Sequence, residues 1–106
     1  MIGQFNLTFE LAWKALQEIL MMHGADGAAT GSPREILQLG YKLGFVDDAT
    51  VWLLMLKKRN TSVHIYNEQE IDEMILLIRD SFIPAFCVLE KTLQRKLEET
   101  KEDWKK

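Results

Sequence analysis

An apolar stripe of helical period runs along the C-terminal third of the chain and restricts the fold more than any other feature. At 100° per residue, one face stays apolar from Ile71 to Leu93. Pro84 projects from the opposite side, so the stripe predicts one long helix that bends at the proline, where a backbone hydrogen bond is lost. Its members are Ile71, Ile75, Ile78, Phe82, Ala85, Phe86, Leu89 and Leu93. Other helices are needed to cover this face.

The first predicted helix, residues 2–23, has an apolar face that is too wide for a single neighbour. One stripe contains Phe5, Phe9, Ala12, Leu16, Ile19 and Leu20. A second stripe beside it contains Leu7, Leu11, Ala15 and Met22. We expect the first stripe to face the core. The second either contacts another subunit or is covered because the helix is central in a monomer.

Local capping signals place the other helix starts. Ser32-Pro33-Arg34-Glu35 combines an N-cap serine, a proline at the first helical position and a capping-box glutamate. Asp47 or Asp48 is expected to open the next helix, and Asn67-Glu68-Gln69-Glu70 repeats the capping-box pattern. No segment shows the alternation typical of a strand. The sequence therefore predicts an all-α fold, an up-and-down bundle of four to five helices.

Residues 1–106 are expected to form a single domain, because no linker, repeat or low-complexity segment divides them. Gly24 is placed to end the first helix. The small residues at 25–31 predict a flexible loop, which lacks the spacing of a phosphate-binding glycine loop. The charged tail at about 98–106 is expected to fray.

Charge and composition exclude several classes of protein. A net charge of −3 argues against a general nucleic-acid binder, which needs a broad basic surface. Cys87, the single cysteine, lies among apolar residues and is predicted to be a buried thiol in a reducing compartment. The chain has no signal peptide pattern and no apolar run of about 18 residues. We therefore expect a cytoplasmic protein without a membrane partner.

The densest polar cluster of the sequence follows the third predicted helix. Arg59 belongs to the helix that Asp47 or Asp48 opens, and it falls in the middle of an apolar stripe on that helix. This position is unexpected, because an unpaired buried charge costs several kcal/mol. The stripe contains Trp52, Met55, Leu56 and Val63. His64 titrates near neutral pH, and Tyr66 adds a phenol. Each residue also has a structural explanation: an ion pair or a snorkelling side chain for Arg59, a helix cap for His64, and a half-buried phenol for Tyr66. The cluster comprises Lys57, Lys58, Arg59, Asn60, His64 and Tyr66.

Two segments carry a resemblance to a known family. The segment R-N-T-S-V-H-I-Y, residues 59–66, resembles the Arg-x4-His-x-Tyr signature of the HEPN superfamily. The segment T-F-E-L-A-W-K, residues 8–14, resembles a block of the same superfamily's branch of nucleotidyltransferase substrate-binding proteins, which includes HepT-type toxins. Weaker similarities lie at 32–35 and 83–86. The resemblance implies a HEPN-like helical bundle.

The resemblance also implies a metal-independent ribonuclease toxin. In this reaction the 2′-OH attacks the adjacent phosphorus, His64 transfers a proton and Arg59 stabilises the charged oxygens. Family members place two such motifs face to face in a homodimer. In HepT-type members a cognate minimal nucleotidyltransferase adenylylates the tyrosine that corresponds to Tyr66. We expect Lys57, Lys58 and Asn60 to contact the substrate, RNA or a nucleotide, and we expect no metal or other cofactor.

Two non-enzymatic alternatives stay open. The same branch includes substrate-binding subunits of two-component nucleotidyltransferases, in which the partner chain carries the metal and the nucleotide. The acidic net charge favours this alternative, whereas the intact motif favours the ribonuclease. A structural helical adaptor is the third hypothesis. It predicts that Arg59 is paired with a carboxylate such as Glu10 in its own subunit and that His64 points away from any cleft.

Overall fold

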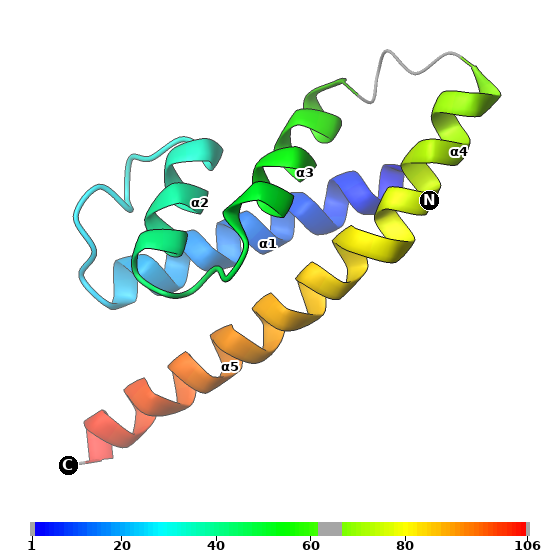
Figure 1. Ribbon diagram of the computed structural model, residues 1–106. Helices are drawn as coiled ribbons and strands as arrows, with labels where there is room; N and C mark the ends of the chain where they lie inside the picture. Colours follow the sequence, from blue (N-terminus) through cyan, green and yellow to red (C-terminus); the bar gives the residue numbers. More distant parts are fainter. Residues whose placement is uncertain (1, 62–66, 106) are drawn as a thin grey trace.

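The computed structural model describes the backbone of residues 2–61 and 67–105, and the side chains of residues 3–61 and 67–99. All regular elements in this part of the chain are helical, which confirms the all-α helical bundle (Figure 1). The elements are α1 (Ile2–Met22), α2 (Pro33–Lys42), α3 (Ala49–Thr61), α4 (Glu68–Leu77), a π-helical turn (Ile78–Phe82) and α5 (Ile83–Lys105).

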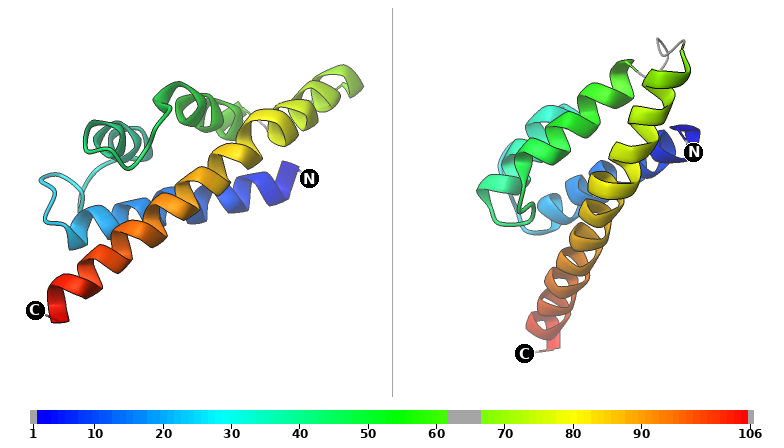
Figure 2. Two further views of the ribbon diagram at one scale, coloured as in Figure 1. Left: turned by 60° about the horizontal axis from the view of Figure 1, so that its bottom comes forward. Right: turned by 45° about the vertical axis from the view of Figure 1, so that its right-hand side comes forward.

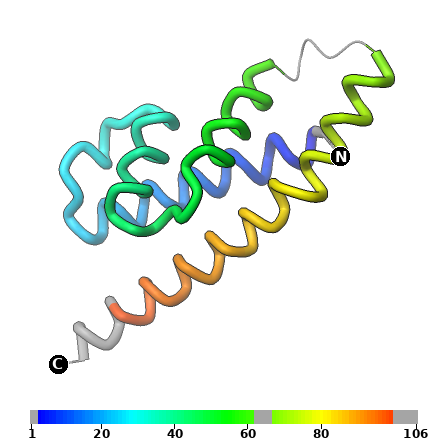
Figure 3. The backbone as a smooth tube through the Cα atoms, in the orientation of Figure 1, coloured from blue at the N-terminus to red at the C-terminus, as the bar shows by residue number. Residues whose placement is uncertain are grey.

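Helix α1 is the common neighbour of the bundle, since it contacts α2, α3 and α5. Helices α1 and α5 begin at the same end and run in the same general direction, whereas α3 lies to one side of them and runs in the opposite direction (Figures 1 and 2). Helix α3 also contacts the π turn. Figure 3 traces the chain from α4 through this turn into α5 without a break. The molecule measures 56 × 24 × 19 Å, and its radius of gyration of 15.0 Å exceeds the ~13 Å of a compact domain of this length. Part of α5 therefore lacks cover from this chain.

The helix starts follow the local capping signals. Ser32 Oγ accepts the N–H of Glu35 at 3.3 Å, and the Glu35 carboxylate accepts the backbone N–H of Ser32, so the predicted capping box is confirmed. Of the two candidate aspartates, Asp48 caps α3 with its carboxylate. Asn67 caps α4, where its Oδ1 accepts a backbone N–H at 2.8 Å. Each cap satisfies a donor that the first helical turn leaves without an intrahelical partner.

The first stripe of α1 lies in the core, as predicted. Phe9 and Trp52 are buried with ring centroids 6.2 Å apart, and Trp52 meets Phe86 edge-on at 5.4 Å. Phe5 stacks on Phe82 at 5.1 Å. These rings join α1 to α3, to the π turn and to α5. Such aromatic pairs add packing energy beyond the burial of their area, so they fix the relative positions of these elements.

The C-terminal third is one continuous helix, as the stripe predicted, but it also contains a π turn just before Pro84 that the stripe did not predict. The N–H of Ile83 bonds to the carbonyl of Ile78, five residues earlier. Such a bond adds about one residue to a turn, so the residues on either side are shifted in phase by about one position. As a result Met74, at 2% exposure, lies in the core, and Ile75, expected there, is only half-buried.

Three further expectations can be compared with the structure. Cys87 is exposed, so its predicted burial is wrong: it lines an open pocket between α1 and α5. In the loop 25–31, Ala28 is buried and its carbonyl accepts the Gln17 amide at 2.8 Å. Helix α5 continues through the predicted tail to Lys105. Flexibility of the loop and fraying of the tail stay predictions. None of the described helices is long and apolar enough to span a membrane.

Candidate functional site

Arg59 lies near the C-terminal end of α3 and turns toward α1. Its Nη1 lies 2.8 Å from Glu10 Oε1, and its guanidinium lies over the Phe9 ring, 5.7 Å from the centroid. The side chains of Arg59 and Glu10 are 29% and 31% exposed. A carboxylate and an aromatic face thus compensate the guanidinium, which explains how a charge can occupy an apolar stripe.

Glu10 is the centre of a small polar network on α1. Its Oε2 accepts the indole N–H of Trp13 at 3.3 Å and lies 3.8 Å from the ammonium of Lys14. These contacts come from positions three and four residues further along the same helix face. The two segments that carry the family resemblance therefore meet in space, because residues 8–14 provide the carboxylate that pairs with Arg59.

Lys57 and Asn60 face a different side of α3 from Arg59. They line an open groove of about 500 Å³ between α3 and the start of α2, and Arg34 lies on its opposite wall. Leucines form the apolar part of this α2–α3 groove. Its lining comprises Arg34, Thr50, Leu53, Leu54, Leu56, Lys57, Asn60 and Thr61. The groove therefore offers two cations, an amide and two hydroxyl groups beside an apolar surface.

The structure divides the predicted cluster into separate parts. Arg59 pairs with α1, Lys57 and Asn60 line the α2–α3 groove, and the half-buried Lys58 does not line it. His64 and Tyr66 lie outside the described residues, so the roles expected for them stay predictions.

Arg34 is the groove residue that sequence reasoning missed. It was interpreted only as part of a helix start. A cation in the first turn of a helix opposes the helix dipole, and this mismatch was the available signal.

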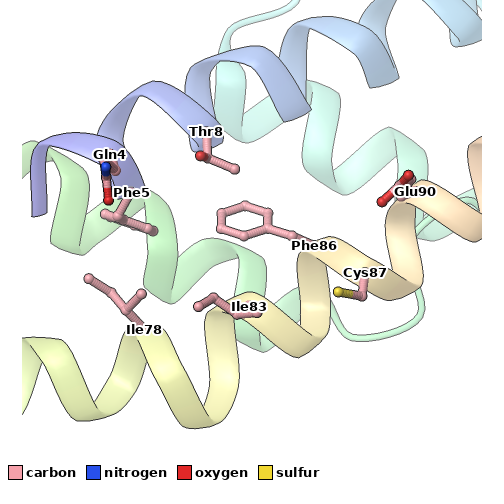
Figure 4. Close-up of a pocket in the computed structure, with 8 residues that line it drawn as sticks. All are labelled: Gln4, Phe5, Thr8, Ile78, Ile83, Phe86, Cys87 and Glu90. Atoms are coloured by element: carbon pink, nitrogen blue, oxygen red, sulfur yellow. The ribbon is translucent and has the colours of Figure 1, made fainter. Parts of the chain in front are cut away.

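A second, apolar groove follows the contact of α1 with α5. One cavity of about 330 Å³ is lined by Phe5, Ile78, Ile83 and Phe86 with Cys87 at its edge, and Figure 4 shows the Phe86 ring between the two helices. A neighbouring cavity of about 490 Å³ lies along the same helices. Both are lined by Thr8, Phe86 and Glu90, so they form one continuous α1–α5 groove.

The fold and the grooves define a small helical-bundle protein with one cation-bearing groove and one apolar groove. A family model described as "nucleotidyltransferase substrate binding protein like" matches residues 1–95. The chain belongs to this family, which is the HEPN/HepT-like group, so the resemblance drawn from residues 8–14 and 59–66 is confirmed. Searches of curated proteins and of solved structures found no match.

Proposed function

We propose that the protein is the substrate-binding partner of a nucleotidyltransferase that itself carries the metal and the nucleotide. The observation that supports this proposal is the chemistry of the α2–α3 groove. The side chains of Arg34, Lys57 and Asn60 can each donate hydrogen bonds to a ligand, and none of the described lining residues is a carboxylate or a histidine. Such a set suits the binding of an anion, whereas proton transfer needs a group that titrates near neutral pH.

The ion pair of Arg59 also favours binding over catalysis. Glu10 already compensates the guanidinium inside the same chain, at 2.8 Å. This contact also meets the first of the two conditions of the structural-adaptor hypothesis. The second condition concerns His64, which lies outside the described residues.

The test is co-expression with a cognate minimal nucleotidyltransferase. We expect one complex in size-exclusion chromatography and faster nucleotidyl transfer than with the transferase alone. Lys57→Gln should reduce this acceleration, while the matched control Lys91→Gln, an exposed lysine on α5, should not. Failure of the two chains to form a complex would refute the proposal.

Ribonuclease activity is the second candidate function. It is favoured by the intact Arg-x4-His-x-Tyr motif, in which Arg59 stands five residues before His64. In this mechanism Arg59 contacts the phosphate and His64 transfers the proton. Wild-type protein should arrest growth on induction, and the purified protein should cleave total RNA with EDTA present. His64→Ala should do neither. Equal RNA profiles with and without the wild-type protein would exclude this activity.

Modification of Tyr66 would regulate such a site. AMP on the phenol adds bulk and negative charge beside the motif, which is expected to occlude it. Incubation with the cognate transferase and ATP should add one AMP to the wild type and none to Tyr66→Phe, as measured by intact-protein mass spectrometry. AMP addition to Tyr66→Phe would assign the modification to another residue.

Homodimerisation is supported by the outer face of α1. Leu7 and Leu11 are both 62% exposed, and Leu11 also lines the α1–α5 groove. Ile83 and Val88 add exposed apolar surface on α5. Exposed apolar side chains that border an apolar groove are typical of a protein interface. We propose that two copies of the chain form a homodimer in which these faces pack against each other.

Light scattering should show a dimer that Leu11→Glu converts to a monomer. The control Leu43→Glu, at an exposed leucine after α2, should leave the dimer intact. The thiol of Cys87 should become more reactive in the monomer, because it lies at the edge of the α1–α5 groove. A wild-type monomer at high concentration would contradict the proposal.

A further inference from the structure

We infer that the α2–α3 groove binds a nucleoside monophosphate, with the phosphate between Arg34, Lys57 and Asn60 and the nucleoside against Leu53 and Leu54. This inference rests on the proposed substrate-binding function and names the class of substrate. It adds Arg34 to the residues that bind the substrate, and it omits Lys58.

The charges of the groove point to an anionic ligand. Among the described residues, no carboxylate pairs with Arg34 or with Lys57, whereas Arg59 has Glu10. Two cations that line one groove without an acidic partner can both attract an anion bound between them. This pair of cations is a local feature of the groove, since the chain as a whole carries a net charge of −3.

The position of Arg34 supports a role in binding rather than in helix stability. It lies in the first turn of α2, where the helix dipole disfavours a cation. Ser32 already caps the N-terminus of α2. The contribution of α2 to ligand binding is therefore the side chain of Arg34 and not the backbone N–H groups at the end of the helix. A guanidinium can donate two parallel hydrogen bonds to a phosphate, and Lys57 adds a point charge.

The size and polarity of the groove indicate a ligand larger than a free phosphate. Its volume of about 500 Å³ is in the usual range for small-molecule sites. Along α3 its lining runs from Thr50 to Thr61, which corresponds to roughly 16 Å at the rise of an α-helix. Phosphate alone would leave Leu53 and Leu54 uncovered. A mononucleotide has a charged end for the cations and a flat body for the leucines.

Isothermal titration of the full chain at low salt tests the inference, with AMP, UMP, adenosine and inorganic phosphate as probes. We expect both nucleotides to bind, and adenosine and phosphate to bind at least about tenfold more weakly. Arg34→Gln and Lys57→Gln should each weaken AMP binding by about tenfold, and Lys91→Gln should not. Leu53→Ala should weaken AMP binding but leave phosphate binding unchanged. Circular dichroism of each variant serves as the control for folding.

Several results would overturn the inference. Equal affinity for adenosine and AMP would show that the cations do not hold the phosphate. A loss of affinity in Lys58→Gln as large as in Lys57→Gln would assign binding to the general positive charge of α3 instead of the groove. A complex with the transferase but no binding of AMP or UMP would reject the inference and leave the proposed function intact. Binding of AMP or UMP without a complex with the transferase would reject the proposed function and leave the nucleotide site intact.

Discussion

The ion pair between Glu10 and Arg59 is expected to contribute measurably to the stability of the bundle. At an effective dielectric constant of 20, two unit charges about 4 Å apart attract by about 4 kcal/mol before desolvation and side-chain entropy are counted. Fully exposed pairs retain only about 0.2–1 kcal/mol. Both side chains here are roughly 30% exposed, so we expect a coupling free energy of about 1 kcal/mol, at the upper end of that range.

A double-mutant cycle of Glu10→Gln and Arg59→Gln measures this coupling. Urea unfolding followed by far-UV circular dichroism gives the free energy of unfolding of each variant. Glu10→Gln should cost about 1 kcal/mol. Arg59→Gln should cost up to about 1 kcal/mol more, because the contact with the Phe9 ring is also lost. The double variant should be close to Arg59→Gln alone.

The exposed pair of Glu10 with Lys14 provides the control. These charged groups are 3.8 Å apart and the lysine side chain is 61% exposed, so the same cycle with Lys14→Gln should give a coupling of at most about 0.5 kcal/mol. If the coupling of Arg59 with Glu10 were no larger than that of Lys14, the ion pair would not explain why Arg59 occupies the apolar stripe of α3.

Three other predictions follow from single positions. A Cβ at Gly40 would lie 2.9 Å from Leu16 Cδ2, so Gly40→Ala should lower the free energy of unfolding by about 1 kcal/mol even though alanine favours the helix; a stabilised variant would refute this. Ser32→Ala removes the cap of α2 and should cost about 1 kcal/mol in the same assay. The hydrogen bond from Arg79 lowers the pKa of the Asp80 carboxyl. This pair therefore stabilises the fold above the ordinary pKa of aspartate, and its contribution is lost as the pH falls through the lowered pKa. An NMR titration should show the lowered pKa of Asp80 in the wild type and not in Arg79→Gln.

The helices and their caps could be predicted because their causes are local. The caps at Ser32, Asp48 and Asn67 depend on side chains within three residues of the helix start. The ion pair of Arg59 was one of the predicted alternatives, because a charge on an apolar stripe requires compensation and Glu10 was a candidate carboxylate.

The features that could not be predicted depend on tertiary contacts or on departures from the α-helix. Plotting at 100° per residue assumes an unbroken α-helix, so it placed Ile75 in the core where the π turn places Met74. Cys87 has apolar neighbours in sequence but lines the open α1–α5 groove, where it is exposed. Arg34 and Lys57 are more than twenty residues apart, and only the packing of α2 on α3 brings both to one groove.

The π turn at Ile78–Phe82 also determines where the chain can tolerate a change in length. Deletion of one residue from an α-helix rotates all following side chains by about 100° relative to the core. Within this turn, a deletion would convert the wide turn to a normal one and leave the flanking segments in their present phase. Pro84 would then meet the carbonyl of residue 80 in a regular helix, which its ring disfavours. We therefore expect deletion of one residue to be tolerated at this turn when another residue replaces the proline at position 84, and not while Pro84 is present.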